Sequence, residues 1–270
     1  MYIFIESDKL EKGATLFIPK KVFDRFSKQV GIFQKILVSA RDRDINEADT
    51  VTIVSDILSD VFGFDKYAEI TSEFAIRNTY CDLAIKIDGK VKYLIEVKAI
   101  GLGLKENHLR QAINYGANEG IQWVVLTNGV EWEIHQIKFE KPIQSELICN
   151  CNFLEINPKK TDDQEKLFLL CKEGLSKAAM DEFAERMENV NRFIMGAILL
   201  DEAVLATIRR ELRRIVPGLK IEQQEIENLL KNEVLKREVL EGEQAKKAKS
   251  KIKRTNSKQA TKKQVEEILE

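Results

Sequence analysis

The segment Val91-Lys-Tyr-Leu-Ile-Glu-Val-Lys-Ala99 predicts a β-strand, because it is rich in β-branched and aromatic residues and follows the turn signal Asp88-Gly89. Side chains alternate across a strand, so Glu96 and Lys98 are expected on one face. A carboxylate and an ammonium group that share a face form either a candidate catalytic site or a solvated ion pair that adds little stability. The opposite face is expected to carry Val91, Tyr93, Ile95 and Val97.

The segments around this strand predict an α/β domain with a mixed sheet flanked by helices. Helices are expected over residues 19–37 and 47–62, and strands over residues 69–76 and 82–87. The strand of Glu96 completes a three-stranded meander. A helix over residues 105–116 then leads to strands over residues 122–127 and 130–137. This order contains one parallel crossover, which should be right-handed.

Asp82 on the preceding strand is the candidate for a second carboxylate. Mg²⁺ prefers one or two carboxylates with waters and phosphate oxygens, and a nearby lysine can stabilise charge during phosphodiester hydrolysis. A two-residue turn at Asp88-Gly89 with regular pairing would place Asp82 and Glu96 on opposite faces. A three-residue loop starting at Ile87 would pair Asp82 with Leu94, diagonal to Glu96 on one face. The site therefore requires an odd loop or a bulge.

Five short motifs occur in order along this part of the chain: Asn46-Glu-Ala-Asp-Thr50, Tyr80-Cys-Asp-Leu-Ala84, Ile95-Glu-Val-Lys-Ala99, Gln111-Ala-Ile-Asn-Tyr115 and Val124-Val-Leu-Thr-Asn-Gly129. Together they resemble the nuclease domain that opens the motor (R) subunit of type I restriction enzymes, a domain of the PD-(D/E)xK class. The third and fourth motifs are the most specific. The resemblance covers about a third of the chain and stops near residue 140.

The resemblance implies a restriction-endonuclease-like core that acts as a Mg²⁺-dependent endodeoxyribonuclease, with Mn²⁺ able to substitute for Mg²⁺. It implies that Asp82 and Glu96 bind the metal ion, that the Val97 carbonyl is a further ligand, and that Lys98 is the catalytic lysine. It also implies that Glu47, on the leading helix, helps to hold the metal ion.

Gln111 and Tyr115 match the pair that lines the DNA side of the family's site, although the same spacing suits a helix surface packed on the sheet. The chain departs from R subunits because it lacks the Gly-x-x-x-x-Gly-Lys loop of their translocase. We therefore expect a free-standing nuclease domain, with a role in restriction or phage defence. The alternative is a catalytically silent nucleic-acid-binding or assembly module that keeps the nuclease fold.

The sequence predicts three parts: a nuclease domain over residues 1–158, an all-helical module over residues 159–241 and a Lys-rich tail over residues 242–270. An apolar stripe from Phe183 to Leu205 is expected to need a partner surface, on this chain, a second copy or another protein. Residues 244–265 contain nine Lys or Arg and no acid, so we expect the tail to be disordered. It is either a solubilising extension or a source of phosphate affinity.

The composition predicts a soluble cytoplasmic protein with no membrane partner. No apolar run reaches the length of a membrane span, and the first residues lack the basic region of a signal peptide. Cys149 and Cys151 resemble half of a zinc site, but no second pair of ligands stands at suitable spacing. His108 and His135 are isolated in the sequence.

Overall fold

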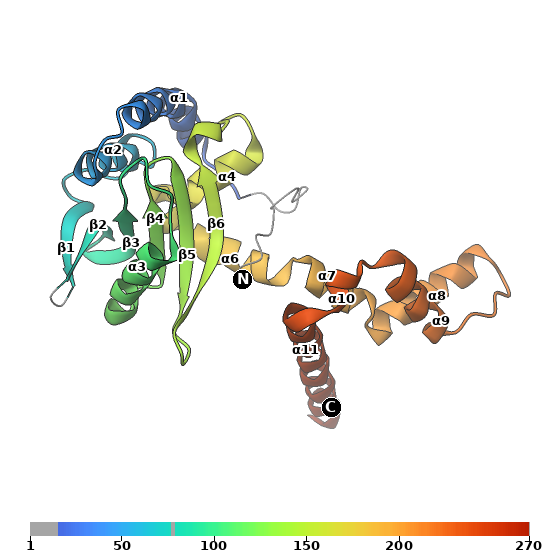
Figure 1. Cartoon of the computed structure of the whole chain (residues 1–270). Helices are drawn as coiled ribbons and strands as arrows, with labels where there is room; N and C mark the ends of the chain where they lie inside the picture. Colours follow the sequence, from blue (N-terminus) through green and yellow to red (C-terminus); the bar gives the residue numbers. More distant parts are fainter. Residues whose placement is uncertain (1–15, 77–78, 270) are drawn as a thin grey trace. The chain divides into compact units, whose positions relative to one another are not determined.

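The computed structural model describes residues 16–76 and 79–269, and it divides into two compact units. The first unit extends to Ala184 and is α/β, and the second begins at Glu185 and is helical (Figure 1). The boundary expected near residue 158 is therefore too early. Helices α4 (Thr161–Leu169) and α5 (Lys172–Ser176) belong to the first unit, because residues of and between them lie in its hydrophobic core.

The first unit contains a six-stranded sheet in the order β1-β2-β3-β4-β5-β6 (Figure 1). The β3–β4 pair is parallel and the other four pairs are antiparallel, so the predicted crossover is confirmed. Strand β6 was not predicted, because this edge strand is polar and exposed over its first half and lacks clear alternation. The strands are β1 (Ile70–Ile76), β2 (Thr79–Ile87), β3 (Lys90–Val97), β4 (Trp123–Thr127), β5 (Glu131–Lys138) and β6 (Gln144–Asn152).

Helices lie on both faces of this sheet. Helices α1 (Lys20–Asp42) and α2 (Glu47–Asp60) share the main core with alternate residues of β3, including Tyr93 and Ile95. Helix α3 (Glu106–Glu119) packs on the opposite face, where Tyr115 joins Leu94 in a second cluster. Helix α2 begins where the Asn46 side chain accepts a hydrogen bond from the backbone N–H of Asp49.

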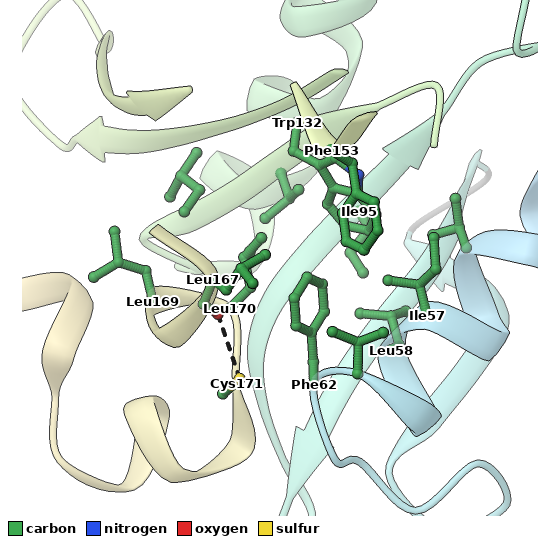
Figure 2. Close-up of a cluster of buried hydrophobic side chains, with 14 of the residues drawn as sticks. Ile57, Leu58, Phe62, Ile95, Trp132, Phe153, Leu167, Leu169, Leu170 and Cys171 are labelled. Atoms are coloured by element: carbon green, nitrogen blue, oxygen red, sulfur yellow. Dashed lines mark hydrogen bonds between the residues drawn. The ribbon is translucent and has the colours of Figure 1, made fainter. Parts of the chain in front are cut away.

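Large aromatic side chains fill the centre of the main core (Figure 2). Phe62, just after α2, meets Trp132 of β5 edge to face, with ring centroids 5.4 Å apart. The buried hydroxyl of Tyr93 donates a hydrogen bond to the Leu170 carbonyl at 3.1 Å. The segment after β6 is therefore part of the core that covers the sheet.

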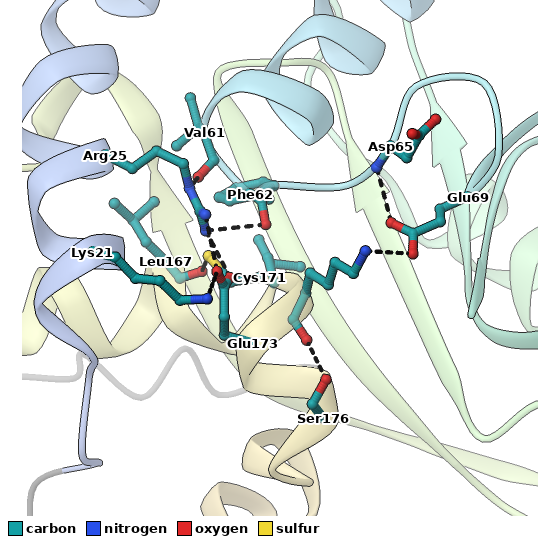
Figure 3. A network of polar contacts seen from close by, with 12 residues as sticks. Lys21, Arg25, Val61, Phe62, Asp65, Glu69, Leu167, Cys171, Glu173 and Ser176 are labelled. Carbon is teal, nitrogen blue, oxygen red and sulfur yellow. Dashed lines mark hydrogen bonds and ion pairs between the residues drawn. The ribbon is translucent and has the colours of Figure 1, made fainter. Parts of the chain in front are cut away.

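An ion pair connects α1 to α5 at the edge of this core (Figure 3). The Arg25 guanidinium donates to both carboxylate oxygens of Glu173, at 3.0 and 2.8 Å. It also donates to the carbonyls of Val61 and Phe62, at 2.8 and 3.3 Å, where the chain leaves α2. Arg25 thus satisfies the two carbonyls that directly follow α2, and Glu173 of α5 balances its charge.

All four cysteines are free thiols in the first unit. Cys81, Cys149 and Cys171 are buried, and Cys151 is half-buried. Burial raises the pKa of the Cys81 thiol to about 12, and it does the same for Cys149. The pair on β6 therefore has the character of core thiols rather than of metal ligands.

The predicted apolar stripe of Phe183 to Leu205 is not continuous. Asn191 and Asp201 cap new helices with their side chains, which divides the stripe among α6 (Ala179–Asn189), α7 (Arg192–Leu199) and α8 (Glu202–Ile215). Ile194 and Leu205 are buried, whereas Val190 is half exposed. The second unit also contains α9 (Gln223–Leu229), a π-helical turn at Leu230–Val234 and α10 (Arg237–Leu240).

The expected disorder of the Lys-rich tail is wrong for residues 242–269, which form helix α11 (Gly242–Leu269). Lys, Ala, Gln and Glu are favourable in helices, and this helix packs through small residues rather than through the large apolar face that the prediction required. Ala245 and Ala248 are buried, and Ala248 and Ile252 cluster with Ile194 and Ala197 of α7.

No helix in the described ranges combines the length and hydrophobicity that a membrane span requires.

We predict that Phe62→Ala lowers the free energy of unfolding of the first unit by about 3–5 kcal/mol, because it leaves a large cavity beside Trp132. Urea unfolding followed by tryptophan fluorescence measures this unit specifically, since both tryptophans, Trp123 and Trp132, lie in it. Tyr67→Ala removes a side chain that is 95% exposed and is the control, with an expected change within about 0.5 kcal/mol. Equal effects of the two substitutions would contradict the packing of Phe62 against Trp132 in the core.

Candidate active site

The register between β2 and β3 places Asp82 beside Glu96. Asp88 and Gly89 both have positive φ values, 53° and 73°, and form a two-residue turn in which Ile87 pairs with Lys90. A bulge follows between Ile85 and Lys86, after which Leu83 pairs with Ile95. The pairing ends there, and one further step in the same register would bring Asp82 opposite Glu96 on one face of the sheet. The negative charge of Asp82 acts on the Glu96 carboxylate, as this proximity requires.

The specific pairing expected for a three-residue loop, Asp82 with Leu94, is therefore wrong, and Ala84 occupies that position. The bulge alternative describes the hairpin, with Lys92 as the extra residue of β3. The bulge also corrects the expectation for Val91, which packs with the second cluster on the α3 side rather than with Tyr93 in the main core.

Glu96 is a buried carboxylate with only one of its oxygens engaged. The residue is 1% exposed, and its Oε1 lies 2.9 Å from the Lys98 Nζ. Its Oε2 is buried and has no hydrogen-bond partner among the described residues. Burial, helped by the negative charge of Asp82, raises the pKa of Glu96 to about 7 despite the opposing effect of Lys98.

Asp82, Lys98 and Glu47 complete the cluster. The backbone N–H of Val97 donates to Asp82 Oδ2 at 2.7 Å, and burial nevertheless raises the pKa of Asp82. The Lys98 Nζ lies 3.4 Å from Oε2 of Glu47, the first residue of α2. Burial lowers the pKa of Lys98, but its hydrogen bond to Glu96 and the surrounding acids outweigh this effect and raise the pKa. Lys98 is therefore an ammonium group at neutral pH.

Gln111 and Tyr115 are joined to each other on α3. The Gln111 Nε2 donates to the Tyr115 hydroxyl at 2.8 Å. Tyr115 is 7% exposed and packs in the second cluster, whereas Gln111 is exposed. The alternative in which this helix surface packs on the sheet therefore describes the tyrosine ring, and Gln111 is the member of the pair that faces solvent.

His108 lies close to the site and was overlooked in the sequence, where it was considered only as a zinc ligand. It precedes Gln111 and Tyr115 by three and seven residues, which places all three along one face of α3. Its Nδ1 is buried without a partner in the described part of the chain. Burial, followed by the charge of Lys98, lowers the pKa of His108, which favours the neutral ring. The helical spacing to the Gln-x-x-x-Tyr motif was the available signal.

The donor atoms of this cluster suit Mg²⁺ better than zinc. Within residues 16–76 and 79–269, no three or more His, Cys, Asp or Glu side chains are grouped so that they could hold a metal ion. Asp82 and Glu96 are two carboxylates, and Mg²⁺ completes its octahedral shell with carbonyl, water and phosphate oxygens. The unpartnered Oε2 of Glu96 leaves an acceptor available for such an ion.

Residues 56–148 match the family model for the N terminus of the type I restriction enzyme R protein. This region resembles an R-protein N terminus. The resemblance inferred from the motifs is thus confirmed over about a third of the chain, and the match includes Asp82, Glu96 and Lys98. Glu47 precedes the R-protein-like region. The chain has no match among curated proteins or among solved structures.

We predict that Glu96 makes the metal-free protein less stable as pH rises. A folded pKa of about 7, above the ordinary 4.5, means that the folded state holds a proton which the unfolded state releases between these values. The free energy of unfolding therefore falls from pH 4.5 through pH 7, by about 3 kcal/mol at 1.36 kcal/mol per pKa unit.

Urea unfolding in EDTA, followed by tryptophan fluorescence from pH 4.5 to 8, measures this effect as the difference between wild type and Glu96→Gln. Glu131→Gln removes an exposed carboxylate and is the matched control, with the pH dependence of the wild type. A Glu96→Gln protein that loses stability over this range as much as wild type does would refute the assignment.

Proposed function

We propose that the R-protein-like region hydrolyses phosphodiester bonds of DNA, with Mg²⁺ held by Asp82, Glu96 and the Val97 carbonyl. The observation that supports this most directly is the unpartnered Oε2 of the buried Glu96. A buried acceptor without a partner destabilises a fold, and it persists at sites where a ligand satisfies it.

The charge balance of the cluster supports a divalent cation. Three carboxylates, those of Glu47, Asp82 and Glu96, lie near the single ammonium group of Lys98. When the three carboxylates and the ammonium group are all ionised, two negative charges remain in excess, and one Mg²⁺ ion neutralises them. In the metal-free protein, burial and the repulsion between neighbouring carboxylates raise the pKa values of Asp82 and Glu96.

Each residue has a role that follows from its position. Bound Mg²⁺ would supply Lewis-acid polarisation of the scissile phosphate. Lys98 is fixed between Glu96 and Glu47 and points its ammonium group into the acidic cluster, where it can orient the attacking water and neutralise charge that develops on phosphate. Glu47 restrains Lys98 at the entrance of α2 and is available to hold a coordinated water.

The choice of DNA and of an endonuclease rests on the resemblance to R-protein N termini. A cytoplasmic role in restriction or phage defence belongs to the same proposal. Supercoiled plasmid, linear duplex, single-stranded DNA and RNA, compared as substrates, test this part separately from the chemistry. Cleavage of RNA alone would replace DNA as the substrate while leaving the proposed metal site intact.

We predict that Lys98→Ala lowers the rate of plasmid cleavage in Mg²⁺ at least about a hundredfold, as expected for the loss of one preorganised electrostatic contact. Lys92→Ala is the matched control, because Lys92 is an exposed lysine of β3, the strand that ends just before Lys98, and it should keep wild-type activity. Circular dichroism of both variants checks that the fold is retained. Equal activity of Lys98→Ala and Lys92→Ala would exclude Lys98 from catalysis.

We predict that cleavage stops in EDTA, returns with Mg²⁺ or Mn²⁺, and is similarly reduced in Glu96→Gln, which keeps the size of the side chain but removes its charge. Titration calorimetry with Mn²⁺ provides a readout that is independent of turnover, and Glu96→Gln should weaken the measured affinity. Full cleavage in EDTA, or unchanged Mn²⁺ affinity in Glu96→Gln, would refute the proposed mechanism.

A further inference from the structure

Helix α11 packs on the second unit through a narrow stripe of small and aliphatic residues. Ala245, Ala248 and Ile252 are spaced by three and four, and the last two contact the cluster around Ile194 and Ala197 of α7. At about 100° per residue, these three positions occupy less than a quarter of the helix circumference. The rest of the helix surface is free to carry polar groups.

The remaining arc of α11 is basic. Six Lys or Arg occur between residues 246 and 254 with no acid among them. At about 100° per residue, Lys246, Lys247, Lys253 and Arg254 lie on the side away from the apolar stripe, and Lys249 and Lys251 flank it. Lys247, Lys249, Lys253 and Arg254 are exposed and have no salt-bridge partner in the described residues. Their charges are therefore available to an external anion.

A groove runs along part of this basic face. Lys246, Lys247, Lys251 and Arg254 line it together with the hydroxyls of Ser250 and Thr255. Its two acids are already engaged, since Glu243 lies 3.0 Å from Lys246 and Glu188 lies 2.9 Å from Lys251. Lys247 and Arg254, seven residues apart on one side of the helix, remain as its unpaired cations.

We infer that the basic face of α11 binds the phosphate backbone of a nucleic acid, without reading base sequence. Residues 246 to 254 extend over about 12 Å of helix at 1.5 Å per residue, which matches several phosphates of a duplex with one charge per about 1.7 Å. Lysines, arginine and hydroxyls are the groups that contact phosphate oxygens. The identity of this polyanion as a nucleic acid rests on the proposed function.

The same face is poorly suited to a membrane surface. An interfacial helix inserts an apolar face beside its basic one, but the apolar stripe of α11 is buried against α7.

The charges of the chain are distributed unevenly between the two units. Residues 1–184 contain 29 acids and 24 Lys or Arg, whereas residues 185–270 contain 15 acids and 19 Lys or Arg. The acidic first unit therefore gains phosphate affinity from the second.

The test is binding of the full chain to a fluorescein-labelled 20-base-pair duplex, measured by anisotropy in EDTA between 50 and 200 mM salt. The test variant carries Gln at Lys247, Lys249, Lys253 and Arg254, which leaves the packing stripe of α11 unchanged. If each cation neutralises one phosphate, the slope of log affinity against log salt becomes shallower by about 3.6. Between 50 and 200 mM salt, wild type should therefore lose about 100-fold more affinity than the variant loses.

The matched control carries Gln at Lys20, Lys28, Lys35 and Lys160, which are exposed on the first unit and change the net charge equally. It should keep a steep salt slope, and circular dichroism should show unchanged helix content in both variants. Equal losses in the two variants, or no change in slope for the α11 variant, would overturn the inference. Tighter binding to phosphatidylserine vesicles or to polyglutamate than to duplex would do the same.

Binding in EDTA separates this inference from the proposed nuclease activity. A chain that binds duplex through α11 but never cleaves it would refute the proposed function alone. A chain that cleaves, with an α11 variant that binds and cleaves like wild type, would refute the inference alone.

Discussion

The register of the β2–β3 hairpin is the constraint on which the candidate site depends. In an antiparallel pair, residues directly across from each other share a face, and a shift by one residue moves a side chain to the other face. The turn at Asp88-Gly89 has two residues, so regular pairing would have separated Asp82 from Glu96. The bulge between Ile85 and Lys86 reverses this outcome before the strands reach the site. It also turns Val91 toward α3, so one extra residue serves both the site and the packing of the sheet.

The core around this hairpin depends on segments that are distant in sequence. Tyr93 is buried on β3, and its hydroxyl needs a partner, which the Leu170 carbonyl supplies. Arg25 joins the end of α2 to Glu173 through four hydrogen bonds. These contacts explain why the first unit extends to Ala184 although the family match stops at residue 148. The segment that follows β6 completes the layer of helices over the sheet.

Most of the sheet could be predicted because its strands have strong local signals. The residues of β4 are apolar as far as Leu126, and apolar and charged residues alternate from Ile95 to Lys98 at the end of β3. The bulge had no such signal, since nothing in the residues around Lys92 distinguishes an extra residue from a paired one. For the same reason the residues of the candidate site were predicted as a set, but the position of the bulge beside it was not. His108 was missed because its significance depends on the direction of a helix face rather than on its neighbours in sequence.

The second unit was harder to predict because its helices are held by caps and small residues. Asn191 and Asp201 interrupt the apolar stripe that the sequence predicted as one surface. Ala245 and Ala248 then bring α11 against α7, and alanine contributes little to any measure of an apolar face. A lysine-rich composition alone resembles disorder, whereas here the spacing of two alanines and an isoleucine determines which side of the helix meets protein and which meets solvent.

The burial of the cysteines has a chemical consequence. The thiolate is the nucleophilic form of cysteine, and burial raises the pKa of Cys81 and of Cys149 to about 12. Burial raises the pKa of Cys151 and of Cys171 as well. At neutral pH the folded first unit therefore presents almost no thiolate to oxidants or alkylating reagents. Buried thiols such as Cys81 and Cys171 react when the core around them opens, so the rate of their modification measures how often this unit opens.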